Sequence, residues 1–256
     1  MQRKGWRAAA LLVAALAFVM LASCGMAGDR LPDYRYRLTV EVETPEGLRS
    51  GSSVIEVKTA IAGKYTIPTP GVNSRRARGE AVAVDLGERG LIFALLRSET
   101  NSDWASGVMF GFAPDVPLIY GEDGKFDASA HTRARFMAML ENRQVIELPE
   151  KFRGSRYIEG GPAKPILVRF ANIAEPTTVE LVDPANLAAS FGEGVKLRRI
   201  TVQLTDDPVT TGIEKRLGWL GQYPEPSLSP NTTQRILAFR QSCIMAISVR
   251  EKHSDS

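Results

Sequence analysis

Thiols and imidazoles, the side chains best suited to nucleophilic, acid–base or metal chemistry, are scarce in this sequence. The 256 residues include two cysteines, Cys24 and Cys243, and two histidines, His131 and His253. A zinc site of the usual His/Cys type needs four such ligands in close, paired spacing, which these residues lack. The sequence therefore predicts no metal site, and the other candidate residues have to be considered one group at a time.

His131 is the histidine that could serve as a general base in the body of the chain. The sequence contains no serine elbow of the Gly-x-Ser-x-Gly type to pair with it. We therefore interpret His131 as an exposed, neutral residue at the start of a helix. Cys243 lies beside Ile244, Met245 and Ile247 without a nearby charge to lower its pKa, which favours a buried, inert thiol over a nucleophile.

Clustered carboxylates occur at two places. Residues 121–127 (Gly-Glu-Asp-Gly-Lys-Phe-Asp) could form a calcium loop, but they lack the alternating ligands and the distant Glu of an EF-hand. A surface turn before a helix is the favoured interpretation. Asp206 and Asp207 are adjacent, and neighbouring residues of a strand point to opposite faces. They are predicted to act in capping and at a strand end, and not as an acid–base pair.

Arginines and aromatic residues are the last candidate groups. Arg75, Arg76 and Arg78 could bind anionic lipid or phosphate, and the alternative is a solvated loop. Three aromatic residues could line a ligand cleft, although core or interface positions are more typical: Trp104, Trp219 and Tyr223. The sequence has no phosphate loop, dinucleotide fingerprint or paired Cys-x-x-Cys. It therefore assigns no catalytic, cofactor-binding or metal-binding residue.

The N-terminal segment has the three parts of a secretory signal. Arg3, Lys4 and Arg7 precede an uncharged apolar run from Ala8 to Ala22, and small residues follow. The run has 15 residues, whereas a spanning helix needs about 20. We expect the positive end to stay on the cytoplasmic side while the apolar run enters the bilayer.

The end of this segment, Leu21-Ala22-Ser23-Cys24, resembles the lipobox of bacterial lipoproteins. The resemblance implies that Cys24 receives a diacylglyceryl group and becomes the mature N-terminus after residues 1–23 are removed. Two or three acyl chains anchor a protein stably, because each buried CH₂ contributes about 0.8 kcal/mol. In Gram-negative lipoproteins an Asp after the cysteine favours inner-membrane retention, so Gly25 favours the outer membrane, facing the periplasm. The alternative interpretation is an uncleaved N-terminal anchor.

The charge balance argues against nucleic acid as a partner. The formal net charge of +3 comes from 32 basic and 29 acidic side chains. Removal of residues 1–23 takes away Arg3, Lys4 and Arg7, which leaves 29 basic side chains against the same 29 acidic ones. The mature chain has no net field to attract nucleic acid. If Cys24 carries lipid, Cys243 has no intramolecular disulfide partner.

The elements that follow are predicted to be mostly strands. Residues 24–33 read as a lipidated tether, and residues 34–43 alternate between apolar and polar side chains, which is typical of a half-buried strand. Thr44-Pro45-Glu46-Gly47 has turn chemistry, and a second strand is expected around residues 53–59. A second, more buried hairpin is predicted from residues 81–86 and 91–96.

Further elements complete the predicted architecture. We expect a loop at residues 60–79, a helix from Ser129 to about Asn142 with Ser129 as a possible cap, and strands at 145–148, 166–170 and 196–204. Two short helices are also expected: one starts at Asp183-Pro184 and is stopped by Gly192, and the other is capped by Thr210 or Thr211 and runs to Leu220. A loop is predicted at 224–230, and strands or a helix near Ile236 and Ile244. These predict an α+β fold, strand-rich, with antiparallel hairpins and few short helices. Residues 34–256 are expected to form one domain, with a possible soft boundary near 149–165.

These observations favour a membrane-anchored envelope lipoprotein whose body binds an envelope protein partner or serves in envelope assembly without catalysis. The membrane contact would be made through the lipid on Cys24, and no cofactor is expected. Two alternatives stay open: a hydrolase of unfamiliar type acting on peptidoglycan, lipid or peptide, since active sites assemble from residues distant in sequence, and a carrier with a sheet-lined apolar pocket for a small ligand.

Overall fold

The computed structural model describes residues 29–61, 73–153, 160–220 and 248–249. This part of the chain is a strand-rich α+β structure with antiparallel sheets and few, short helices, which confirms the fold class expected from the sequence. It divides into two compact units. The described residues of unit 1 are 29–32, 59–61, 73–74 and 115–135, and those of unit 2 are 33–58, 75–114, 136–153, 160–220 and 248–249.

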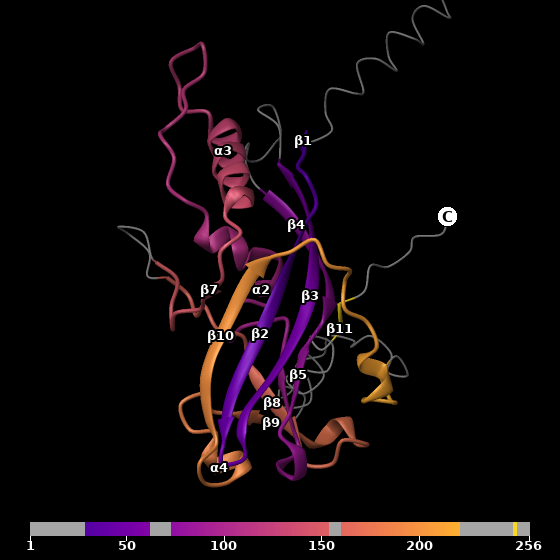
Figure 1. Cartoon of the computed structure of the whole chain (residues 1–256). Coiled ribbons are helices and arrows are strands. Elements are labelled where there is room, and N and C mark those ends of the chain that lie inside the picture. Colours follow the sequence, from indigo (N-terminus) through magenta and orange to yellow (C-terminus); the bar gives the residue numbers. More distant parts are fainter. Residues whose placement is uncertain (1–28, 62–72, 154–159, 221–247, 250–256) are drawn as a thin grey trace, which may run out of the picture. The chain divides into compact units, whose positions relative to one another are not determined.

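Strands outnumber helices along the described residues (Figure 1). The strands are β1 (Asp29–Arg30), β2 (Tyr34–Thr44), β3 (Gly47–Ile61), β4 (Asn73–Glu80), β5 (Val82–Asp85), β6 (Leu91–Ala94), β7 (Ile146–Glu147), β8 (Leu167–Phe170), β9 (Val179–Val182), β10 (Lys196–Leu204) and β11 (Ser248–Val249). The helices are α2 (Trp104–Gly107), α3 (Ala128–Glu141) and α4 (Ala188–Phe191), with short 3₁₀ turns η2 (Gly87–Arg89), η3 (Met109–Phe112), η4 (Pro176–Thr178) and η5 (Ile213–Lys215).

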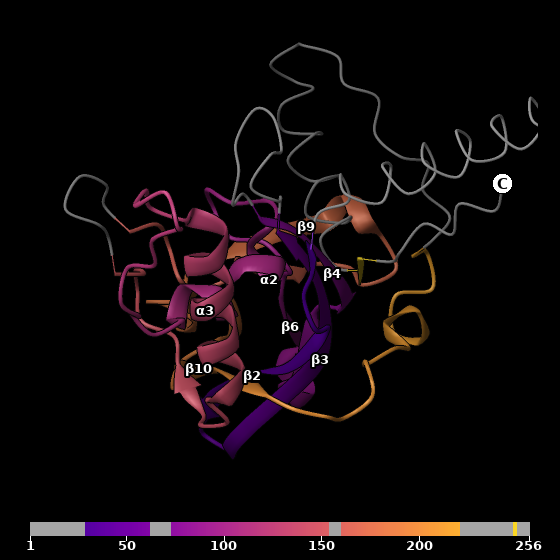
Figure 2. The same cartoon turned by 90° about the horizontal axis from the view of Figure 1, so that it is seen from above.

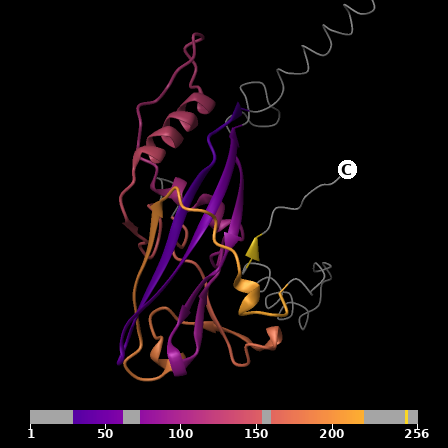
Figure 3. The same cartoon turned by 45° about the vertical axis from the view of Figure 1, so that its right-hand side comes forward.

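Two antiparallel sheets organise these strands. The larger has the order β11-β4-β3-β2-β10-β7, with β1 also paired to β3, and the smaller has the order β5-β6-β8-β9. In unit 2, β2 lies between β3 and β10 (Figure 1). Figure 2 and Figure 3 show from two further directions that the smaller sheet lies beside β2 and β3. The core of unit 2 lies between these layers.

The first predicted hairpin is confirmed in detail. On β2, the side chains of Tyr36, Leu38, Val40 and Val42 have no exposed surface, while the residues between them are half-buried or exposed. This pattern follows because successive side chains of a strand point to opposite faces. β2 pairs with β3 from Tyr34↔Val57 to Thr44↔Gly47, and a two-residue turn joins the strands. The register therefore keeps the whole apolar face of β2 in the core.

Several other predicted elements are also present. β5 and β6 form the second hairpin, and β7, β8 and β10 occupy the predicted strand ranges. Gly192 ends α4 with a φ of +92°, a backbone conformation that glycine adopts without strain. The helix predicted near residue 129 is α3, but its cap is Asp127 and not Ser129, because the Asp127 carboxylate accepts the N–H of Ala130 at 2.9 Å.

Three predictions were wrong for reasons of tertiary structure. Residues 73–79, expected in a loop, belong to β4, which pairs with the long strand β3. Asp183 does not start a helix, because its carboxylate accepts the N–H of Ala185 at 2.8 Å in a tight turn, and α4 begins later. Thr210 does not cap a helix either, because its hydroxyl accepts the N–H of Val54 on β3 at 2.9 Å.

The short turn η5 has Gly212 at its start, and Thr211 provides no cap there. A buried carboxylate does this work instead: Glu80 accepts the N–H groups of Gly212 at 3.2 Å and of Ile213 at 2.9 Å. Such a partner lies far away in sequence, so local patterns do not reveal it. The elements predicted at 224–230 and near Ile236 and Ile244 lie outside the described residues.

The close approach of the two sheets gives a stability prediction. A Cβ atom on Gly51 would overlap the carbonyl group of Ala83, because it would lie 2.9 Å from the carbonyl carbon and closer still to the oxygen. Because that neighbour is backbone, we expect Gly51→Ala to lower the free energy of unfolding by about 2 kcal/mol, measured by urea denaturation. Gly218→Ala is the matched control, since no heavy atom lies within 4 Å of the place its Cβ would take. Equal stability of the two variants would contradict this packing.

Candidate functional site

His131 lies in the first turn of α3 in unit 1 and is half-buried. Its ring packs against Phe126, with ring centres 5.4 Å apart. Its backbone N–H is bonded to the carbonyl of Asp127 at 3.0 Å. The imidazole of His131 thus packs against an aromatic ring, and this contact gives no support to a role as general base.

The carboxylates of residues 121–127 are used within a turn, as predicted. The N–H of Gly121 donates to the carbonyl of Lys125 at 2.8 Å, and Asp123 accepts the N–H of Lys125 at 3.2 Å. Asp127 caps α3, as described above. In the described ranges, no group of three or more His, Cys, Asp or Glu side chains lies close enough together to hold a metal ion.

Asp206 and Asp207 follow the end of β10 and have separate partners, which confirms their predicted strand-end role. Asp207 accepts the Thr205 hydroxyl at 2.7 Å and forms an ion pair with Arg37. The hydrogen bond from Thr205 is the main cause that lowers the pKa of Asp207, and the Arg37 charge adds to it. Asp206 lies 3.3 Å from Arg143. Each carboxylate is therefore engaged by a different basic side chain.

The predicted arginine and aromatic candidates are distributed through the fold. Arg75 places its guanidinium 5.1 Å from the ring centre of Phe110, whereas Arg76 and Arg78 are exposed on β4. Trp104 and Trp219 are buried, and their ring N–H groups donate to carbonyl oxygens at 3.0 Å and 2.8 Å. Both tryptophans are thus core residues. The remaining candidates lie outside the described residues: Cys24, Tyr223, Cys243 and His253.

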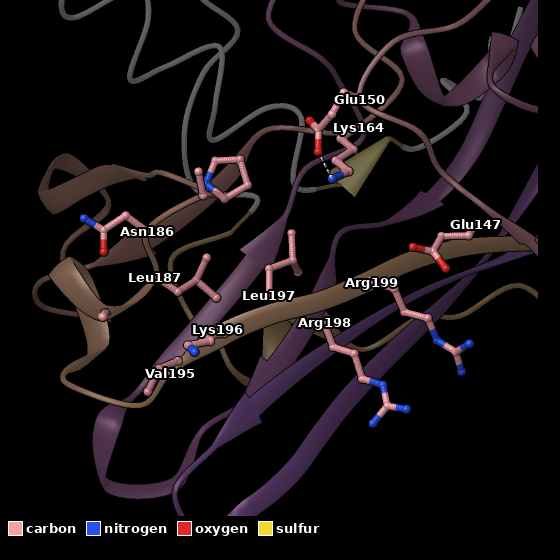
Figure 4. Close-up of a pocket in the computed structure, with 13 residues that line it drawn as sticks. Glu147, Glu150, Lys164, Asn186, Leu187, Val195, Lys196, Leu197, Arg198 and Arg199 are labelled. Carbon is pink, nitrogen blue, oxygen red and sulfur yellow. Dashed lines mark hydrogen bonds and ion pairs between the residues drawn. The ribbon is translucent and has the colours of Figure 1, made fainter.

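The site that the structure adds is a groove of roughly 390 Å³ in unit 2. We call it the β10 groove. It is lined by the first part of β10 and the residue before it (195–199), by the segment that leads into α4 (184–188), and by Glu147, Glu150 and Lys164. Figure 4 shows these segments around the groove, with Lys164 and Glu150 joined as an ion pair. Segments distant in sequence therefore meet here.

One long side of the β10 groove is an open strand edge. β10 pairs with β2 from Lys196 to Leu204, but on its other side only Thr201 and Val202 pair with β7. The N–H of Leu148 adds one hydrogen bond to the carbonyl of Ile200 at 2.8 Å. Within the described parts of the chain, Lys196–Arg199 have no strand partner on this side. In that part of the chain, the backbone donors and acceptors on this side of Lys196–Arg199 are thus not used by another strand.

A β-bulge sets the direction of the side chains along this edge. Leu197 pairs with Val42 and Arg199 with Glu41, so Arg198 is an extra residue on β10. Figure 4 shows Leu197 on the side of the ribbon that carries Lys164 and Glu150, and both arginines on the opposite side. The bulge therefore keeps an apolar side chain in the groove while it directs two guanidinium groups to the other face.

Glu41 anchors those two arginines. Arg199 holds it with two hydrogen bonds of 2.9 Å, while the Nε of Arg198 lies 3.5 Å from it. Arg198 also lies 3.8 Å from Glu43, so its guanidinium makes only long contacts. The Arg199 hydrogen bonds are the largest cause that lowers the pKa of Glu41, and the same pairing raises the pKa of Arg199. This pair consequently stays ionised and joins β2 to β10.

Lys196 differs from the other basic residues of the groove. It is exposed at the start of β10, and among the described residues it forms no ion pair, whereas Lys164 is paired with Glu150. The sequence analysis missed this site. Its one local signal is the interruption of alternation at Arg198-Arg199, where two charged residues follow each other inside a strand. The open edge itself depends on where β7 ends, which no local pattern reports.

The Glu41–Arg199 pair can be tested by NMR titration of the Glu41 carboxyl. We expect Arg199→Ala to raise the Glu41 pKa markedly, and Arg198→Ala to raise it less, because Arg198 contributes only a longer-range charge. The folded pKa lies below the unfolded one, so the pair stabilises the fold near neutral pH and this contribution is lost as the pH falls toward the folded pKa. Equal shifts in the two variants would contradict the bidentate geometry.

Comparisons of the chain with protein-family models, with curated protein sequences and with solved structures found no match. None of the helices in the described ranges is long and apolar enough to cross a membrane. The open edge and the charges of the β10 groove are therefore the structural basis for a functional proposal.

Proposed function

We propose that this chain is a bacterial envelope lipoprotein, anchored by a lipid on Cys24, whose strand-rich body binds a protein partner without catalysis. The observation that carries the binding role is the β10 groove, where an open strand edge lies beside a hollow lined by charged and apolar side chains. Exposed strand edges are sites at which other chains add to a sheet. The anchoring role rests on the Leu21-Ala22-Ser23-Cys24 pattern.

Binding without turnover agrees with the way two of the described acidic groups, Glu41 and Asp207, are used. Glu41 is held by Arg199, and Asp207 by Thr205 and Arg37, so the pKa values of both carboxyls are lowered. A carboxylate that is held ionised by such partners is a weak general base and a poor proton donor at neutral pH. These groups link strands across the solvated face of the sheet, which suits a rigid binding body.

The proposed anchor would also restrict where this body can act. Four residues separate Cys24 from β1. The five Cα–Cα steps from Cys24 to Asp29 span at most about 18 Å even when the chain is fully extended. The body would therefore work close to the membrane surface, and Gly25 favours the outer membrane, with the body facing the periplasm. A partner would be another component of the same envelope.

Lipid anchoring predicts a specific change in mass and location. In wild-type protein we expect a chain that begins with acylated Cys24, measured by intact mass spectrometry of membrane fractions. Cys24→Ser removes the thiol that is alkylated, so the variant should keep residues 1–23 and lack the mass of the lipid. Cys243→Ser is the matched control and should leave both mass and membrane association unchanged, apart from the substituted atom. Wild-type protein that starts at Met1 without lipid would overturn the anchoring proposal.

Partner binding predicts a stable complex in the membrane. Chemical crosslinking of the lipidated protein followed by affinity purification should recover the same envelope protein repeatedly, and recovery should fall when Cys24→Ser removes the lipid and leaves residues 1–23 in place. The purified body of residues 25–256 should show no turnover of peptidoglycan, phospholipid or peptide substrates. Turnover of one of these substrates at a saturable rate would overturn the non-enzymatic proposal.

A further inference from the structure

We propose that the β10 groove binds an extended, acidic segment of the partner protein, which adds to the larger sheet as a strand beside Lys196–Arg199. This inference rests on the proposed partner-binding function and goes beyond it, because it names the position, the conformation and the charge of the bound segment.

The strand geometry of the β10 edge requires that the bound segment be extended. Lys196, Leu197 and Arg199 pair with β2 on one side, with Arg198 as the bulge residue, while on the other side of β10 the strand β7 pairs with Thr201 and Val202 only. Four strand residues span about 13 Å. An added strand would continue the line of β7 along β10, and its main-chain groups would satisfy the open donors and acceptors. A helix cannot do this, because its backbone groups are already bonded to one another.

The side chains around the edge favour alternate apolar and polar residues in the bound segment. Leu187 is buried and Leu197 half-buried beside the hollow, while Asn186 and the Lys164–Glu150 pair lie around it. Figure 4 shows Leu187 and Leu197 on the same side of the β10 ribbon. Every second side chain of an added strand would point toward this apolar floor, and the residues between would point away from it.

Charge decides which polar residues fit. Four basic and two acidic residues line the groove, and the guanidinium groups of Arg198 and Arg199 lie on the solvated face of β10, to which the outward side chains of an added strand would also point. Glu150 is already paired with Lys164, and Glu147 attracts Arg199. Among the described residues Lys196 forms no ion pair, and its cross-strand neighbour Glu43 lies 3.8 Å from Arg198 instead, so an Asp or Glu on the bound segment would complement Lys196. A basic segment would instead face like charge.

The same charges argue against a second copy of this chain as the occupant. If two copies paired through this edge, the basic side chains of Lys196 and Arg198 of one copy would lie close to the basic side chains on the same edge of the other copy. Basic residues on an edge strand are known to oppose such self-association. Like charge on this edge therefore disfavours pairing with a second copy of the chain, whereas an acidic segment is attracted, which makes binding specific.

Site-specific photocrosslinking tests the position of the bound segment. p-Benzoylphenylalanine is placed at Ala185, an exposed residue of the groove, and separately at Ile173, an exposed apolar residue outside it. Both are made in the full-length, lipidated protein in bacterial cells. We expect an adduct with a partner at Ala185 and none at Ile173. Mass spectrometry of the adduct should map to a partner segment that contains Asp or Glu and lacks a net positive charge.

Two further measurements separate strand addition from other contacts. Lys196→Glu should reduce the yield of the Ala185 adduct at least about fivefold through charge repulsion, while Lys215→Glu, the same change on an exposed lysine outside the groove, should leave it unchanged. A synthetic peptide with the crosslinked sequence should bind the purified protein, and N-methylation of its alternate backbone nitrogens should abolish binding. Binding that survives N-methylation would overturn strand addition.

The outcomes distinguish this inference from the proposed function. A partner that is recovered by affinity purification but crosslinks only at Ile173 would leave partner binding intact and overturn the β10 groove as its site. A basic or helical segment at Ala185 would overturn the inferred chemistry. The absence of any partner in both experiments would overturn the proposed function, and this inference with it.

Discussion

The pairing of β2 with its two neighbours is the constraint on which the rest of unit 2 depends. Tyr36, Leu38, Val40 and Val42 point into the core with no exposed surface, while β3 and β10 bond to either edge of the strand. A shift of register by one residue would turn this apolar set toward solvent and bring the charged set into the core. The register is therefore strongly specified, and the elements attached to β3 and β10 take their positions from it.

The charged face of the same strand connects this constraint to the site. Glu41 on β2 is held by Arg199 on β10, and Arg35 reaches Glu56 on β3. The arginine side chains of both pairs are partly exposed and the carboxylates half-buried, and partly solvated ion pairs contribute little energy individually, so their importance lies in direction more than in stability. Together with the bulge at Arg198, they keep both guanidinium groups on the solvated face and leave Leu197 beside the β10 groove.

The parts of the fold that could be predicted are those whose signal is local. The β2–β3 hairpin follows from strict alternation of apolar and polar residues and from a Pro-containing turn. Gly192 ends α4 because the backbone there has a positive φ, which glycine adopts without strain. The failures share a different cause. β4 is a strand because β3 is long enough to pair with it, and Thr210 bonds to Val54 instead of capping a helix. In each case a partner far away in sequence overrides the local preference.

The sequence by itself determined the strand-rich α+β class, the inward face of β2 and the structural use of the paired carboxylates, because alternation and turn chemistry act between near neighbours. It also supplies the pattern around Cys24 on which the anchoring proposal rests. Only the tertiary structure decided that β7 pairs with Thr201 and Val202 of β10 and that residues 184–188 border the groove beside the first part of this strand. A strand edge is open where no other strand pairs with it. Which strands pair depends on the packing of the whole sheet, and therefore on residues that are distant in sequence.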